Sequence, residues 1–215
     1  MIEHYLYLCR HGYRDDDDDE LIGNDGLNKY GVAQVKLLAK KLQKFDIDFI
    51  MVSPFKRTLA SAEIISSALS IPFHIEPLIS EWINDEWHSG IPQLEEPEQI
   101  IQRYPHAIFQ TQDLFIPSAY PETYEAMQGR CKRVAEVILD NERNLLIVTH
   151  GIIISHIVAA LTKLGPERFV NEISSLTILK HNRMGDWEIK LNNSLEHLQK
   201  YTANIRFFTN RGDQL

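Results

Sequence analysis

The chain has 215 residues, of which 44% are hydrophobic and 24% charged, as is typical of a globular protein. Its formal net charge of −8 argues against a broad nucleic-acid surface, so we expect any anion site to be built locally from a few convergent cations. The apolar runs are too short to span a membrane and the two cysteines too few for a disulfide framework, which predicts a cytoplasmic protein without membrane or nucleic-acid partners.

Strand and helix patterns alternate along the first part of the chain. Residues 5–9 predict a strand, and residues 49–52 predict a second, short one. Between them, apolar residues recur at helical spacing after Asn28, a residue type that caps helices. Ser53 and Pro54 then predict the N-cap and the first residue of another helix.

The alternation continues along the rest of the chain. Residues 124–138 carry apolar side chains at helical spacing, and residues 152–164 predict a further helix. Residues 145–149 are apolar almost throughout, as in a strand that is covered on both faces. Residues 175–180 and 187–191 predict two late strands with a turn between them.

This order of elements predicts the fold class. Alternating strands and helices are typical of an α/β protein, here a three-layer α/β/α sandwich with a mostly parallel central sheet. We expect one domain over residues 1–215, with an inserted helical and loop subregion at about 82–120.

Two histidines follow strands of this sheet. Arg10-His11-Gly12 comes after the first strand, and His150-Gly151 comes after the apolar one. Ligands of such sheets bind beyond the carboxyl ends of the strands, so we expect both imidazoles in one site. Arg10 offers a planar donor fork for phosphate oxygens, and Gly12 allows unusual dihedrals and close backbone approach.

Two further arginines belong to this hypothesis. Arg57 lies in the first turn of the predicted helix after Ser53, where free amides and the helix dipole favour anions. Arg14 lies one turn beyond His11. Either arginine alone is more simply explained as a solvent-facing charge. The remaining histidines show no metal-ligand spacing, so we predict no metal and no cofactor.

The ordered set of motifs resembles the histidine phosphatase superfamily, the phosphoglycerate mutase-like group. The stretches that carry this resemblance are residues 9–12, 53–62, 76–82 and 148–151. A narrower resemblance is to the branch of ubiquitin-associated, SH3-containing tyrosine phosphatases and ecdysteroid-phosphate phosphatases. It rests on Arg14, Glu81-Trp82, and residues 120–124 leading into a helix with Arg130-Cys131. A related domain also occurs in a transcription factor assembly subunit.

The resemblance implies roles for these residues in a metal-independent phosphomonoester hydrolase. His11 would be the nucleophile that forms a phosphohistidine, with His150 as a second catalytic residue. Glu81 would be the general acid, although Asp85 and Glu86 lie close by in the sequence. The expected phosphate-binding residues are Arg10, Arg14, Arg57, His150, Gly12 and Gly151.

Several questions stay open at this point. The alternatives in function are a phosphoglycerate mutase-type phosphotransferase and a non-catalytic module that binds phosphate or phosphopeptides. The expected partner is a phosphorylated small molecule or a phosphotyrosine-type substrate, and the resemblance allows a homodimer. Trp82 and Trp87 either form a substrate wall or simply pack the insertion. The acidic run at residues 15–20 is expected to be a solvated loop, or a segment that repels polyanions.

Overall fold

A seven-stranded sheet with the strand order β4-β3-β2-β5-β1-β6-β7 organises the protein. The structure, a computed structural model, describes residues 3–14, 24–109, 119–139 and 142–199. The strands are β1 (His4–Arg10), β2 (Phe49–Val52), β3 (Phe73–Ile75), β4 (Ala107–Ile108), β5 (Leu145–Thr149), β6 (Leu176–His181) and β7 (Trp187–Ser194). Strands β1 to β5 pair in parallel, whereas β6 is antiparallel to both β1 and β7. The predicted, mostly parallel sheet is therefore confirmed.

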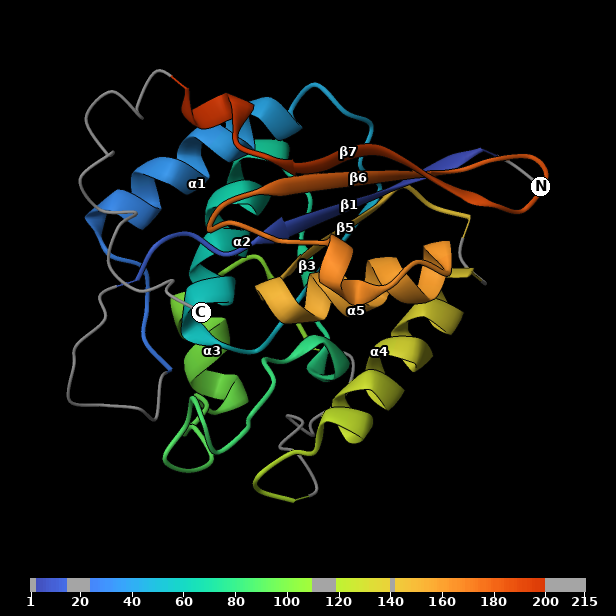
Figure 1. Ribbon diagram of the computed structural model, residues 1–215. Helices are drawn as coiled ribbons and strands as arrows, with labels where there is room; N and C mark the ends of the chain where they lie inside the picture. The colour runs from blue at the N-terminus through green and yellow to red at the C-terminus, as the bar shows by residue number, and fades with distance from the viewer. Residues whose placement is uncertain (1–2, 15–23, 110–118, 140–141, 200–215) are drawn as a thin grey trace.

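Helices cover both faces of this sheet (Figure 1). The α-helices are α1 (Lys29–Leu42), α2 (Lys56–Leu69), α3 (Pro97–Arg103), α4 (Tyr124–Leu139) and α5 (Gly151–Thr162). Short 3₁₀ helices are η1 (Pro77–Ile79), η2 (Pro166–Arg168) and η3 (Glu196–Leu198).

The alternation of side chains along β1 shows how the two layers are filled. Tyr7 and Cys9 belong to a core shared with α1 and α2, whereas Leu6 and Leu8 belong to a second core shared with α4 and α5. Successive strand residues point to opposite faces, so a central strand that is covered on both sides needs an uninterrupted apolar sequence. The three-layer α/β/α prediction is therefore confirmed.

The beginnings of α1 and α2 contrast. The side chain of Asn28 caps α1 as predicted, accepting hydrogen bonds from the amides of Tyr30 and Gly31. The prediction for α2 is wrong by two residues, because its N-cap is Phe55 rather than Ser53. The Ser53 hydroxyl lies instead 2.8 Å from Nε2 of His150. This hydroxyl therefore makes a tertiary hydrogen bond and does not cap the helix.

The region expected to be inserted contributes to the sheet as well as to the surface. Residues 82–96 have no regular structure beyond turns, and α3 and β4 follow them. β4 pairs in parallel with β3 and forms one edge of the sheet. The acidic run at 15–20 lies outside the described residues. None of the helices in the described ranges has the length and apolar character needed to cross a membrane.

Candidate active site

The carboxyl ends of β1 and β5 bring the two predicted histidines together. The strands are neighbours with Arg10 opposite Thr149, and the amide of His11 donates to the carbonyl of Thr149 at 3.1 Å. The imidazole rings of His11 and His150 lie edge to face with 5.4 Å between their centroids. The predicted juxtaposition of the two strand-end imidazoles is therefore present in the structure.

The contacts of His11 define which of its ring nitrogens can react. Its side chain is buried, and Nδ1 lies 2.8 Å from the carbonyl oxygen of Gly12. A carbonyl only accepts, so Nδ1 carries the proton and Nε2 keeps a lone pair. Burial, followed by the charges of Arg57, His150 and Arg10, holds the pKa of His11 well below its ordinary value. The imidazole is therefore neutral, and hence nucleophilic, near pH 7.

His150 is held between a hydroxyl and a carboxylate. Its Nε2 lies 2.8 Å from Oγ of Ser53, and its Nδ1 lies 3.1 Å from Oε2 of Glu81. The carboxylate accepts from Nδ1–H, so in the neutral ring Nε2 accepts from the Ser53 hydroxyl. Burial lowers the pKa of His150 to about 4, although the Glu81 carboxylate acts in the opposite direction.

Arg57 reaches the same carboxylate from the first turn of α2. Its Nη2 lies 3.3 Å from Oε2 of Glu81, and its guanidinium lies over the ring of Phe55 at 4.6 Å. Burial lowers the pKa of Arg57 to about 10, which leaves it charged at neutral pH. Burial alone raises the pKa of Glu81, but His150 and Arg57 outweigh it and hold that pKa well below its usual range.

Arg10 is fixed by the segment that precedes β6. Its Nη1 donates to the carbonyl of Asn171 at 2.8 Å. A Cβ atom at Gly151 would lie 3.3 Å from that carbonyl oxygen and 3.4 Å from Nη1 of Arg10. A Cβ atom at Gly151 would therefore crowd the carbonyl that holds Arg10, whereas its distance from the guanidinium itself is an ordinary contact.

Gly12 is required for packing rather than for unusual dihedrals. A Cβ atom there would lie 2.7 Å from the carbonyl oxygen of Gly31, where α1 crosses the chain. Its amide donates to Oγ of Ser61 at 3.1 Å. Among the described glycines, Gly185 has a positive φ and Gly12 does not. Gly12 therefore does not use the positive φ that a glycine allows.

Arg14 is less closely tied to this cluster than the other arginines. It forms an ion pair of 2.7 Å with Asp25, and its side chain is one-third exposed. Its charge still contributes to lowering the pKa of Arg57, which places it within electrostatic reach of the site.

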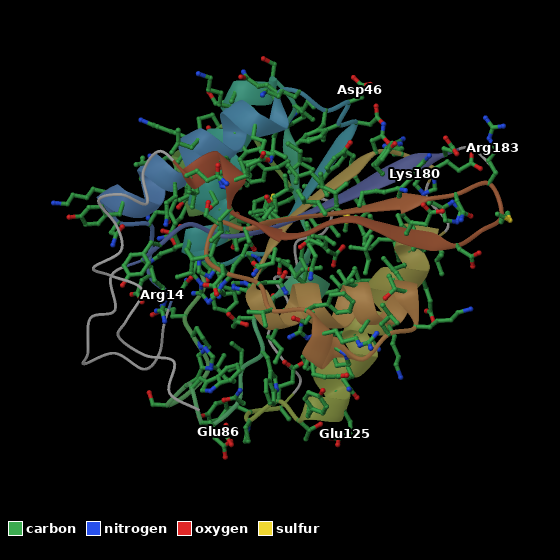
Figure 2. The ribbon with its side chains drawn as sticks, turned by 45° about the horizontal axis from the view of Figure 1, so that its top comes forward. Arg14, Asp46, Glu86, Glu125, Lys180 and Arg183 are labelled. Carbon is green, nitrogen blue, oxygen red and sulfur yellow. The ribbon has the colours of Figure 1, made fainter. Side chains whose placement is uncertain are left out.

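The structure also separates Glu81 from the two neighbouring candidates for the acid. Asp85 and Glu86 are both exposed, and Figure 2 shows Glu86 at the surface, pointing away from the body of the molecule. The carboxylate of Glu81 contacts both Arg57 and His150. Geometry therefore favours Glu81.

A pocket of about 630 Å³ opens beside Arg10 and Glu81. Much of its wall is apolar or aromatic, contributed by Trp87, Tyr124, Ile152, Pro166, Phe169 and Val170. Trp82 packs edge to face against Trp87 at 5.4 Å and donates from Nε1 to the carbonyl of Glu122 at 2.8 Å. One tryptophan thus lines the pocket while the other supports it.

Sequence reasoning missed several residues of this site. The sequence predicts a helix cap at Ser53 and assigns no role to the hydroxyl of Ser61 or to the carbonyl of Asn171. A backbone acceptor such as the Asn171 carbonyl leaves no mark in a sequence. Within the described ranges, no cluster of three or more His, Cys, Asp or Glu side chains is arranged to hold a metal ion.

Comparisons with known proteins agree with this geometry. The family model described as the histidine phosphatase superfamily (branch 1) matches residues 6–194. The transcription factor tau 55 kDa subunit of Saccharomyces cerevisiae is 30% identical over 194 residues, which cover 80% of this chain. The match covers 44% of that subunit, so the chain spans less than half of its length.

Solved structures extend the likeness to the whole fold. The α-ribazole phosphatase from Shigella flexneri superposes with a TM-score of 0.67 at 21% identity, covering 89% of this chain and 96% of that one. Phosphoserine phosphatase from Entamoeba histolytica, in complex with 3-phosphoglyceric acid, gives a TM-score of 0.65 at 20% identity, covering 91% and 99%. The predicted enzyme class, a phosphatase of the histidine phosphatase type, is confirmed at the level of the family. The chain belongs to the histidine phosphatase superfamily, branch 1.

Proposed function

We propose that this protein is a metal-independent phosphomonoester hydrolase that works through a phosphohistidine on His11. The observation that carries the proposal is the tautomer of His11: Nδ1–H is bonded to the Gly12 carbonyl, so Nε2 is the nucleophilic atom. Arg10, Arg57 and His150 surround it, and all three suit the oxygens of a phosphoryl group. A phosphate monoester carries a charge of about −1.5 to −2 near neutral pH, which the two guanidinium groups balance.

In the first half of the reaction, Nε2 of His11 attacks phosphorus in line with the leaving oxygen. The N–P bond forms as the P–O bond to the substrate breaks, and the leaving oxygen takes a proton from the carboxyl of Glu81. Negative charge spreads over the equatorial oxygens in the transition state, where fixed guanidinium and imidazole donors stabilise it.

In the second half, water attacks the phosphohistidine. The carboxylate of Glu81 accepts the proton of that water, the N–P bond breaks, and inorganic phosphate leaves with His11 neutral again. Acid and base are thus the same group in its two protonation states, as microscopic reversibility requires when one carboxyl serves both steps.

Substrate binding supplies the protonated state of Glu81. In this structure its carboxylate contacts Arg57 and His150, which hold its pKa well below the usual range. A phosphate dianion that binds the same two groups compensates the charge of Arg57, takes the hydrogen bond of His150 and repels the carboxylate. These effects raise the pKa of Glu81, because nearby opposite charge favours the ionised form and like charge disfavours it.

The pocket beside Glu81 supports a substrate whose leaving group is an aryl or otherwise bulky apolar group. Such a substrate is either a small phosphorylated molecule or of the phosphotyrosine type. Trp87, Tyr124 and Phe169 offer aromatic faces to such a group. Among the lining residues that the structure describes, Glu167 adds a carboxylate. That charge disfavours substrates with a second anionic group and so argues against the phosphoglycerate mutase alternative.

Other parts of the proposal rest on the sequence. Membership of the narrower branch of SH3-containing and ecdysteroid-phosphate phosphatases would fit the apolar pocket. The family model supports membership of the superfamily and does not distinguish this narrower branch. The cytoplasmic location and the homodimer stay predictions. The relative that is a transcription factor subunit favours one second candidate, a module that binds phosphorylated partners without turnover.

Hydrolysis of p-nitrophenyl phosphate by the purified protein, with and without a chelator, tests the proposal. We expect phosphate release that the chelator leaves unchanged and that His11→Asn abolishes. His74→Asn is the matched control, because His74 lies on β3 and stacks on Phe49 at 4.2 Å, outside the site. A sample denatured at alkaline pH, where the N–P bond is stable, should contain phosphohistidine. Equal rates for His11→Asn and the wild type would refute the proposal, and binding of phosphate without turnover would favour the module.

A further inference from the structure

In the part of the chain that the structure describes, the largest of the fully buried side chains is that of Arg130 on α4, which is 1% exposed. Its Nε and Nη2 donate to the two carboxylate oxygens of Glu122 at 2.8 and 2.9 Å. The same guanidinium donates to the carbonyls of Leu78 at 2.8 Å, Ser80 at 2.7 Å and Glu81 at 3.0 Å. These bonds account for all the N–H donors of an arginine.

The carbonyls that Arg130 binds belong to the segment that presents the general acid. This segment runs from η1 to Glu81, so Arg130 holds the backbone of the acid itself. The segment that begins α4 also holds the chain just after Glu81. The amide of Glu122 donates to the carbonyl of Ile83 at 2.8 Å, and Nε1 of Trp82 donates to the carbonyl of Glu122 at 2.8 Å.

We propose that Arg130, oriented by Glu122, is a positioning residue that sets where the carboxyl of Glu81 meets the leaving oxygen. The inference rests on the proposed function, because it assigns Arg130 to the acid step of that reaction. The hydrogen bonds of Arg130 described above end on Glu122 and on the backbone that carries Glu81, so its effect on the chemistry runs through Glu81.

The chemistry of the leaving group separates positioning from a purely structural role. A nitrophenolate leaves without a proton, whereas an alkoxide needs one in the transition state. A misplaced acid therefore slows the cleavage of alkyl phosphates and spares that of p-nitrophenyl phosphate. Displacement of a reacting group by about 1 Å costs on the order of 100-fold in rate, so the selectivity is measurable.

The experiment compares kcat/KM for p-nitrophenyl phosphate and benzyl phosphate, two aromatic substrates whose leaving groups differ in acidity. This parameter includes formation of the phosphohistidine but not its hydrolysis, and so isolates the step that needs the acid. The variants are Arg130→Lys, which keeps the positive charge but loses the planar set of N–H donors, and Glu122→Gln, which keeps the size of the side chain but loses its negative charge. Glu81→Gln is the positive reference. Arg133→Lys, an exposed arginine on the same helix, is the matched control.

We expect Arg130→Lys to lower kcat/KM for benzyl phosphate about 10- to 100-fold more than for p-nitrophenyl phosphate, as Glu81→Gln does. Glu122→Gln should show the same selectivity to a smaller degree, and Arg133→Lys should show none. Equal losses on both substrates, no loss on either, or failure of both Arg130→Lys and Glu122→Gln to fold overturns the inference. If the wild-type protein does not cleave p-nitrophenyl phosphate, the proposed function is overturned instead. The wild-type rate alone decides this point, so the two failures can be distinguished.

Discussion

Replacing Glu81 by glutamine should weaken catalysis and at the same time strengthen phosphate binding. The carboxylate of Glu81 lies 3.1 Å from Nδ1 of His150 and 3.3 Å from Nη2 of Arg57, two groups that we assign to the phosphoryl oxygens. An incoming phosphate must therefore displace the carboxylate from two donors, the guanidinium of Arg57 and the imidazole of His150. Glutamine keeps the size of the side chain and removes that competing charge.

The size of the effect follows from the contacts. A hydrogen bond to a charged group contributes about 1.5–3 kcal/mol, and a neutral one about 0.5–1.5 kcal/mol. Arg57 is only 3% exposed, so solvent screens its pairing with Glu81 weakly. Exchanging the charged acceptor for a neutral one thus returns about 1.4 kcal/mol to the ligand, or about tenfold in Kd. Loss of the acid lowers kcat by about 100-fold or more.

Isothermal titration with inorganic phosphate at pH 7 measures the affinity, and steady-state hydrolysis of benzyl phosphate measures the turnover. Glu86→Gln is the control, because Glu86 is exposed and lies only five positions along the same loop region (Figure 2). It should change neither quantity. If Glu81→Gln binds phosphate no more tightly than the wild type, the carboxylate does not compete for the anion site and our reading of these contacts is wrong.

Three further substitutions test the surroundings of the site. Burial holds the pKa of His11 well below its ordinary value of roughly 6.5, so stability is fully present above that pH and is lost as pH falls below it. His11→Asn should remove this contribution. The unfolding free energy from urea melts should then fall between pH 6 and pH 5 by about 1.4 kcal/mol per pH unit less than in the wild type, and an equal pH dependence in both proteins would contradict this. Gly12→Ala places Cβ 2.7 Å from the carbonyl oxygen of Gly31 and should cost about 1–3 kcal/mol of unfolding free energy, whereas an unchanged melting temperature would exclude the packing role. Gly151→Ala brings Cβ to 3.3 Å from the carbonyl oxygen of Asn171, which accepts from Arg10, and should raise KM for p-nitrophenyl phosphate about tenfold if that carbonyl moves and takes the guanidinium with it. An unchanged KM would show that Arg10 is not disturbed.

The elements that the sequence predicts well are those whose burial leaves a pattern. β5 is fully buried along its length, and the apolar run at residues 145–149 reports this directly. α4 has one buried face, which its helical spacing reveals. β3 and β4 have three and two residues, too few for any alternation to be recognised. Their pairing is decided by the rest of the sheet, so sequence reasoning could not find them.

The site divides in the same way. Because parallel strands end at one edge of the sheet, the positions of His11 and His150 after two strands were enough to predict that the rings meet. The segment that carries Glu81 has no such periodicity, and its resemblance to the family supplied the candidate. Contacts such as Ser53 with His150 join residues 97 positions apart and depend on the packed structure. Sequence alone offered the local alternative, a helix cap, and that alternative was wrong.

The charges of the site explain why a fold can hold so many cations at one sheet edge and still be stable. Arg57 is buried and charged, and an unpaired buried charge is strongly unfavourable. The carboxylate of Glu81 neutralises it, so the general acid of the proposed reaction also serves as the counter-ion of the site. A phosphate dianion brings its own charge and takes over that second role. Once the phosphate is bound, the charge that kept Glu81 ionised is compensated and the pKa of its carboxyl rises. Binding of the substrate and protonation of the acid are therefore coupled. Without a counter-ion, the buried charge of Arg57 would destabilise the empty site. Without a carboxyl that can be protonated, the occupied site would lack the proton for the leaving oxygen.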